Sequence, residues 1–144
     1  MIVVDANVLA YATGDDHPLR EPSRRAIAAV AARRLDATTT AEVIQEFVHV
    51  RARRHGRTGA ARLGLHYATL FAPLLPVGAE ALEAALRMYD RHERLGAFDA
   101  LLAAAAIQAK ATALVSADED FSGIRGLRHI VPGTAEFDAL VRPD

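Results

Sequence analysis

Four acidic residues are spread along this sequence so that each one follows a predicted strand or lies in the first turns of a predicted helix. They are Asp5, Glu46, Asp99 and Asp118. Any one of them alone is well explained as a helix cap, because Asp is common at the N-cap and in the first turn. Four carboxylates at one edge of a sheet would instead repel each other and raise each other's pKa unless a cation held them ionised. An all-oxygen ligand set selects a hard cation, so the set predicts a site for Mg²⁺ or Mn²⁺.

Other catalytic motifs are missing from the sequence. There is no Cys, which excludes disulfides, thiolate metal sites and cysteine nucleophiles. The six His residues show no HExxH or other paired ligand spacing, and we interpret each as a surface or packing residue. GxxxxGK[ST], GxGxxG, GxSxG and calcium-loop patterns are also absent.

The segments around the four acids alternate between short apolar runs and longer stretches of helical periodicity. This alternation predicts a parallel sheet covered by helices on both faces, within one domain spanning residues 1–144. In such sheets sites form beyond the carboxyl ends of the strands, where the winding reverses, and Asp5 falls there. The expected strands are 1–5, 35–40, 74–78, 111–118 and 128–132; the expected helices are 20–34, 41–54, 58–71, 79–92 and 98–110, with a turn or helix at 134–141.

The net charge and the hydropathy pattern limit the classes of protein that fit this sequence. The net charge of −1 argues against nucleic-acid binding through overall charge but leaves a local basic patch possible. The first apolar run stops at Asp5 with no basic residue before it, so we expect neither a signal peptide nor a membrane span. The sequence therefore predicts a soluble cytoplasmic protein with no membrane contact, to which the lack of Cys also conforms.

Two glutamates follow the 35–40 segment, and geometry separates them. Thr39-Thr40-Ala41-Glu42 has the pattern of a capping box, in which Glu42 turns back to the N-cap amide. On a helical wheel Glu46 instead borders the apolar face formed by residues 43, 44, 47 and 50. We therefore assign a structural role to Glu42 and a site role to Glu46.

The segments MIVVDANVL, TTTAEVIQEF, GAFDALLAAAA and LVSADEDF resemble, in order and spacing, the four acidic motifs of PIN-domain nucleases, and most closely those of the VapC toxins of bacterial toxin-antitoxin pairs. The resemblance spans nearly the whole chain. It implies a three-layer α/β/α sandwich with a central, mainly parallel sheet. It also implies Mg²⁺- or Mn²⁺-dependent cleavage of RNA, a homodimer, and neutralisation by a cognate antitoxin protein.

The resemblance also implies roles for individual residues. Asp5, Glu46, Asp99 and Asp118 match the family's catalytic acids, with Asp5, Asp99 and Asp118 as metal ligands. Asn7, Ser116 and Asp120 match the positions that support them. Asn7 stands where Ser or Thr is frequent, and family members vary in which acid of the Asp118–Asp120 loop approaches the metal.

A cation held by these carboxylates would acidify a water molecule and polarise a phosphoryl oxygen. Hydroxide attack in line does not use the RNA 2′-OH, so the predicted products carry 5′-phosphate and 3′-OH ends. Substrate binding also needs positive charge, and the segment VRARRHGRTGAAR supplies it; either phosphate contact or mere solvation at a helix end explains these residues. The candidate RNA-binding residues are Arg51, Arg53, Arg54 and Arg57, with Arg62 and His55 beside them.

Three other functions fit parts of the pattern. A structure-specific DNA nuclease shares the chemistry, but this chain is short for the extra segments that grip DNA. A haloacid-dehalogenase-like phosphatase also begins with an apolar strand and Asp, but it normally has a second Asp where this chain has Asn7. A non-catalytic binding module would not need all four acids.

Overall fold

The computed structural model describes residues 1–142, and in that range it contains seven α-helices and four short strands. The elements in chain order are β1 (Ile2–Val4), α1 (Ala6–Thr13), α2 (Arg20–Ala31), β2 (Ala37–Thr38), α3 (Ala41–His55), α4 (Arg57–Leu70), α5 (Ala79–Arg91), α6 (Ala97–Gln108), β3 (Leu114–Val115), the 3₁₀ turn η1 (Glu119–Phe121), β4 (His129–Ile130) and α7 (Ala135–Val141).

The four strands form one parallel sheet in the order β2-β1-β3-β4. The chain leaves β1 for β2 on one side and later returns to β3 on the other, so the winding reverses between β1 and β3. Val4 pairs with Val115, and the residues that follow them, Asp5 and Ser116, therefore leave the sheet side by side. The sheet edge expected to carry a site is thus the edge at which Asp5 lies.

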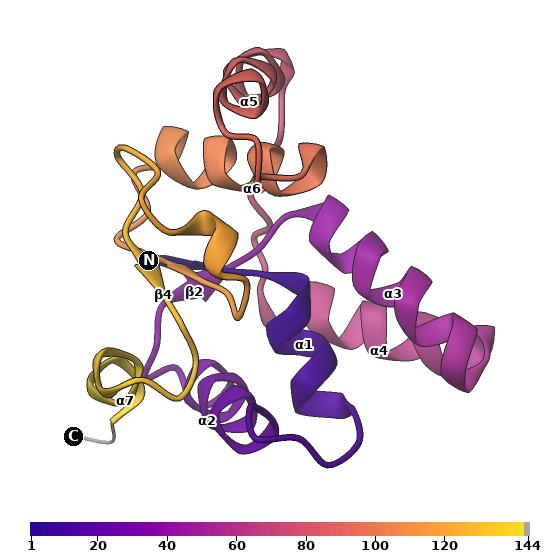
Figure 1. Ribbon diagram of the computed structural model, residues 1–144. Helices are drawn as coiled ribbons and strands as arrows, with labels where there is room; N and C mark the ends of the chain where they lie inside the picture. The colour runs from indigo at the N-terminus through magenta and orange to yellow at the C-terminus, as the bar shows by residue number, and fades with distance from the viewer. Residues whose placement is uncertain (143–144) are drawn as a thin grey trace.

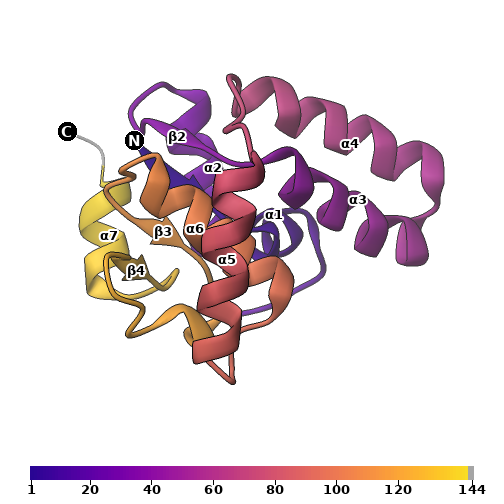
Figure 2. The same cartoon turned by 90° about the horizontal axis from the view of Figure 1, so that it is seen from above.

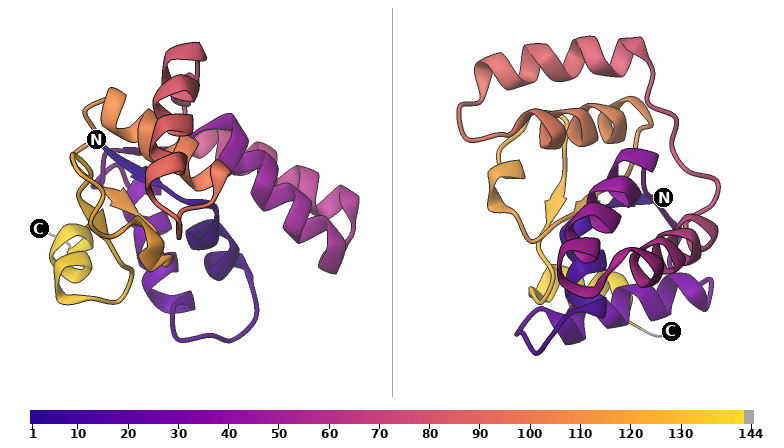
Figure 3. Two further views of the ribbon diagram at one scale, coloured as in Figure 1. Left: turned by 45° about the horizontal axis from the view of Figure 1, so that its top comes forward. Right: turned by 90° about the vertical axis from the view of Figure 1, so that its right-hand side faces the viewer.

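Helices cover both faces of this sheet. Figure 1 shows α5 and α6 over one face and α1, α2 and α7 over the other, and the right-hand view of Figure 3 shows the same layers. Helix α6 lies between the sheet and α5, which explains why it is so apolar. Its small buried side chains allow close approach on two sides; they are Ala100, Ala103, Ala104, Ala105 and Ala106. The predicted α/β/α sandwich with a parallel sheet is confirmed.

Helices α3 and α4 form a hairpin that extends away from the sheet (Figure 2). The two helices approach closely at Gly64, where an added Cβ would lie 2.5 Å from Cγ2 of Val48. The rings of Phe47 and Tyr67 pack edge to face with their centroids 5.2 Å apart. The two helices are therefore packed closely against each other, and Phe47 and Tyr67 belong to the same hydrophobic core as the sheet.

The structure differs from the expected elements at two places. The strand expected at 74–78 is wrong, because only an isolated bridge between Thr40 and Leu75 forms there. Pro76 lacks the N–H that a ladder would need, and Gly78 already caps α5. The second difference is α1, a helix that is not among the expected elements and that Asp5 caps. In the described range no helix combines the length and the apolar character needed to cross a membrane.

Candidate active site

Asp5 is the most strongly fixed of the four acids. It is only 5% exposed, and it directly follows β1 and caps α1. Its Oδ1 accepts a hydrogen bond of 2.6 Å from the Ala6 amide. Its Oδ2 accepts bonds from Asn7 Nδ2 at 2.8 Å and Ser116 Oγ at 2.6 Å. The capping role and the site role are therefore compatible, because one oxygen serves the helix while the other meets polar side chains.

Asn7 and Ser116 join the ends of β1 and β3 through side chains. Asn7 Nδ2 donates to Ser116 Oγ at 2.9 Å, and Asn7 Oδ1 accepts from the Ala117 amide at 3.0 Å. Ser116 is fully buried, and its Oγ also accepts from the Asp118 amide at 3.0 Å. Both side chains therefore hold Asp5 and the start of the Asp118 loop in one fixed arrangement.

The loop after β3 carries the remaining acids of this edge. Asp118 Oδ1 accepts from the Asp120 amide at 2.9 Å and so caps η1. Asp120 Oδ1 forms an ion pair of 2.7 Å with Nη2 of Arg94. Arg94 comes from the segment between α5 and α6, and nothing in its local sequence indicated this contact. Because the Arg94 side chain is 82% exposed, the pair adds little stability.

Glu46 and Asp99 reach the same place from helices. Asp5, Glu46 and Asp99 line one pocket, whose walls come from the residue after β1, from α3, from α6 and from the segment before α5. The cavity measures about 20 Å³, which is room for one water molecule or one cation but not for a nucleotide. Asp118 is not part of its lining, yet its charge acts on both Asp5 and Asp99.

The charges of these groups are strongly coupled. Burial raises the pKa of Asp99, and the neighbouring charges of Asp5, Asp118, Glu46 and Asp120 raise it further, to about 7. Desolvation of its carboxylate, and then the charge of Asp5, raise the pKa of Glu46, although the residue as a whole is exposed. Burial also raises the pKa of Asp5, against the opposing effect of the bonds from Ser116 and Ala6. The acids predicted from the sequence therefore share one electrostatic environment.

The donor chemistry of this pocket fits a hard divalent cation. Within residues 1–142, no three His, Cys, Asp or Glu side chains are arranged closely enough to hold an ion without movement. The carboxylates nevertheless raise each other's pKa, and a cation would relieve that repulsion. A carboxylate oxygen on the pocket wall, Oε2 of Glu42, is buried and has no hydrogen-bond partner in the described part of the chain.

The capping role predicted for Glu42 is wrong. The N-cap of α3 is Thr40, whose Oγ1 accepts from the Val43 amide at 3.2 Å. Thr39 instead donates its hydroxyl to the carbonyl of Val4 at 2.7 Å, because its own backbone still belongs to the sheet edge. Glu42 is thus the second residue of the helix, one position short of a capping box, and its carboxylate turns to the pocket.

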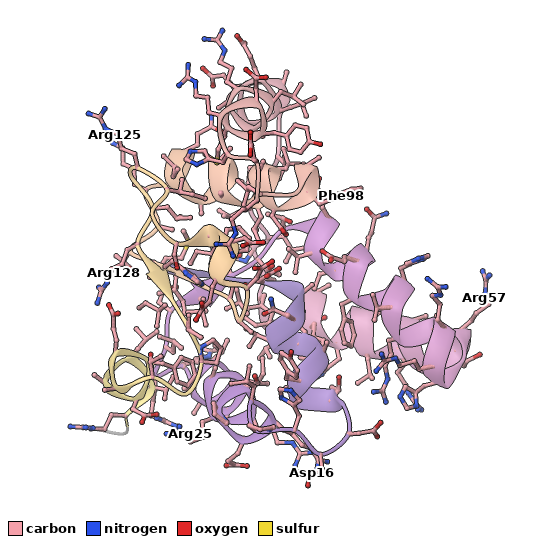
Figure 4. All side chains as sticks on the ribbon, in the orientation of Figure 1. Asp16, Arg25, Arg57, Phe98, Arg125 and Arg128 are labelled. Carbon is pink, nitrogen blue, oxygen red and sulfur yellow. The ribbon has the colours of Figure 1, made fainter. Side chains whose placement is uncertain are left out.

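The predicted arginines lie outside this pocket. Arg51 donates from Nη1 to the Thr13 carbonyl at 2.9 Å and so binds the C-terminal end of α1. Arg53 is seven residues beyond Glu46 on α3, about 10 Å further along the helix axis. Arg54 is exposed, and Arg57 projects from the far end of the α3–α4 hairpin (Figure 4). The structure therefore gives Arg51 a packing contact and leaves Arg53, Arg54 and Arg57 at the surface.

Sequence reasoning underestimated one histidine. His129 on β4 contacts the Ser116 carbonyl through Nε2 at 2.9 Å and Ser122 Oγ through Nδ1 at 3.0 Å. Because a carbonyl only accepts, Nε2 carries the proton. Any positive charge on this ring lowers the pKa of Asp5. Its place inside the predicted strand 128–132 was the only signal in the sequence.

Comparison with known proteins gives the family. Residues 2–127 match the PIN domain, and the chain belongs to the PIN-domain family. Within it the chain is similar to Ribonuclease VapC7 of Mycobacterium tuberculosis, with 46% identity over 98% of both proteins. It is also 35% identical to Ribonuclease VapC23 of that species, over 70% of this chain and 79% of the relative.

A solved structure shares the fold. It is a chain described as a toxin-antitoxin complex from Klebsiella pneumoniae, which matches with a TM-score of 0.64 and 18% identity. The match covers 88% of this chain and 95% of the other. At this identity the likeness concerns the fold alone.

Proposed function

We propose that this chain is an endoribonuclease that hydrolyses RNA phosphodiester bonds with Mg²⁺ or Mn²⁺, and that it is the toxin of a type II toxin-antitoxin pair. The observation that carries the proposal is the coupling of Asp5, Glu46 and Asp99 around one small cavity where the sheet winding reverses. The names of the relatives supply RNA as the substrate. Membership of the PIN-domain family argues against the haloacid-dehalogenase-like alternative.

In this proposal Asp5, Asp99 and Asp118 hold the cation, and Glu46 completes the catalytic set. A divalent cation bound there would neutralise charge on the phosphoryl group and generate a nucleophile from water at neutral pH. Asn7 and Ser116 keep Oδ2 of Asp5 in place, since both donate to it. Asp120 supports the loop of Asp118, and Arg94 balances its charge.

In the same proposal, positively charged side chains outside the pocket bind the RNA strand. Arg53, Arg54 and Arg57 offer exposed positive charge along the α3–α4 hairpin. Arg51 remains a candidate for RNA contact, although its bond to Thr13 already engages part of its guanidinium. Phosphate contacts of this kind fix the position of the strand and carry no sequence information.

We also propose a cellular setting, in which the chain is a cytoplasmic protein neutralised by a cognate antitoxin. The solved structure that shares its fold is described as a toxin-antitoxin complex, which supports this proposal. We also propose a homodimer. Exposed apolar side chains spaced along one side of α5, Leu82, Leu86 and Tyr89, offer a surface for it.

The test is cleavage of matched RNA and DNA oligonucleotides by the purified chain. We expect cleavage of RNA with Mg²⁺ or Mn²⁺, none in EDTA, and products with 5′-phosphate and 3′-OH ends. Asp99→Asn should be inactive yet folded, which excludes a contaminating nuclease. Undiminished cleavage in EDTA or cyclic phosphate ends would contradict the mechanism, and cleavage of DNA alone would favour the DNA nuclease.

A further inference from the structure

Phe98 is unusually exposed for a large apolar side chain. At 80% it is the most exposed large hydrophobic residue between positions 1 and 142, ahead of Leu65 at 71%. It lies in the first turn of α6, a helix whose other apolar residues are mostly buried. A phenyl ring in water makes no contribution to the core, so packing does not explain it.

The ring stands at the mouth of the acidic pocket. Phe98 lines the pocket together with Asp99, its neighbour in the chain, and with Glu46 from α3. Figure 4 shows Phe98 at the end of α6 that faces the beginning of α3, pointing outward. Since helical neighbours one residue apart point about 100° from each other, Asp99 faces the cavity while Phe98 borders its opening.

The size of the cavity decides what can meet this ring. A space of about 20 Å³ admits a cation or a water molecule, so the nucleotides on either side of a bound phosphate must lie outside it. Their bases would then lie at the opening, where the exposed aromatic face is. Proteins that bind single-stranded RNA commonly stack unpaired bases on such rings.

We propose that Phe98 is a substrate-binding residue that stacks on the base of a nucleotide next to the cleaved bond. This inference rests on the proposed ribonuclease function and adds a specific contact to it. Stacking would hold the strand across the opening and favour unpaired RNA, because a base within a duplex does not present its face. Phe98 takes no part in proton transfer or cation binding.

Two substitutions of the ring separate stacking from simple bulk. Phe98→Leu keeps an apolar side chain without an aromatic face, whereas Phe98→Trp enlarges that face. On short single-stranded RNA we expect Phe98→Leu to raise KM about tenfold to a hundredfold with kcat nearly unchanged, and Phe98→Trp to retain or improve KM. Leu65→Ala, which removes a similarly exposed apolar side chain from α4, should leave KM unchanged.

An abasic substrate tests the contact directly. In an RNA with a mapped cleavage site, one abasic nucleotide is placed in turn on each side of the cleaved bond. At one of these positions we expect the wild type to lose the same factor in KM as Phe98→Leu, with no further loss when both changes are combined. The natural sequence contains no Trp, so Phe98→Trp introduces a single one. Combined with Asp5→Asn to prevent cleavage, it gives a fluorescence signal that stacking of a base should quench.

The outcomes separate this inference from the proposed function. If the wild type cleaves no RNA, the proposed function fails, and the stacking role fails with it. If the wild type cleaves RNA and Phe98→Leu matches it on every substrate, only the stacking role is wrong. Equal losses for Phe98→Leu on intact and abasic RNA at both positions would also overturn it.

Discussion

The candidate active site has two halves that the protein builds differently. The strand-end half consists of Asp5, Asn7, Ser116 and Asp118, which are joined by hydrogen bonds between 2.6 and 3.0 Å. The helix half consists of Glu46 and Asp99, and no hydrogen bond to either side chain occurs in the described part of the molecule. Only in the first half is the acid fixed before anything binds.

The difference teaches how a site of like charges can be both ordered and adaptable. Bonds from Ser116 and Ala6 lower the pKa of Asp5 and partly offset its burial, so that its carboxylate is held as an acceptor. For Asp99 all influences act in one direction. Burial and four negatively charged neighbours raise its pKa to about 7. The strand-end half therefore sets the geometry of the site, and the helix half supplies negative charge that a bound cation would neutralise.

The largest expected effect concerns the two glutamates of α3. Glu46→Gln keeps the size of the side chain but removes a charge that couples to Asp5 and Asp99, so cleavage should fall about a hundredfold or more. Glu42→Gln should reduce it by less than about fivefold, since Glu42 acts on neither acid in this arrangement. RNA cleavage at saturating Mn²⁺ is the measurement, with thermal midpoints as the control for folding.

The reverse result would have a definite meaning. If Glu42→Gln were the inactive variant, the unpartnered Oε2 of Glu42 would be the site oxygen contributed by α3. The helix half would then begin one turn earlier than proposed.

The second-largest expected effect is on the free energy of unfolding. We expect a substitution in the strand-end half to lower it and a substitution in the helix half to raise it. In the wild type, Ala6, Asn7 and Ser116 all donate hydrogen bonds to the Asp5 carboxylate. Asp5→Asn replaces one of its oxygens with an NH₂ group that cannot accept, so the free energy of unfolding should fall by about 1 to 2 kcal/mol. Asp99→Asn removes a repelled charge and leaves no donor without its acceptor, so it should gain about 1 kcal/mol. Denaturant unfolding at pH 8 in EDTA measures both. Gains in both variants would mean that burial of charge outweighs the hydrogen bonds of Asp5.

The acids of both halves were expected from the sequence, whereas some of the residues around them were not. The positions of Asp5 and Ser116 can be predicted because each follows a short apolar run directly. Recognising the run as a strand therefore also locates the residue at its end. Glu42 was misplaced because the capping-box pattern puts the N-cap at Thr39, whereas the N-cap of α3 is Thr40 and Thr39 bonds to the neighbouring strand β1. Contacts between distant segments, such as Arg94 with Asp120, have no local pattern to reveal them.

The smallest expected effect is a pH dependence of the cation-free protein that belongs to the helix half. The pKa of Asp99 is about 7 in the folded chain and near 3.8 when the chain is unfolded, so between these values the folded state binds more protons. Unfolding free energy should therefore decline as the pH rises from about 4 toward 7 and level off above it. Since Asp99 is only half-buried, we expect a decline on the order of 1 kcal/mol rather than the full value of the shift.

Asp99→Asn should remove most of this decline, so its advantage over the wild type should be absent near pH 4 and grow to its full size by about pH 7. Asp16→Asn, which removes one charge from the exposed loop before α2 on the far side of the molecule (Figure 4), is the matched control and should leave the decline in place. Denaturant unfolding in EDTA at several pH values measures all three proteins. Because a bound cation displaces the same proton, saturating Mn²⁺ should abolish the decline, since Asp99 then carries no proton in either the cation-bound folded state or the unfolded state near pH 7. A wild-type decline that persists in Asp99→Asn would place the coupled proton on Glu46 or Asp5, and a flat wild-type profile would show that the helix half is not under electrostatic strain at all.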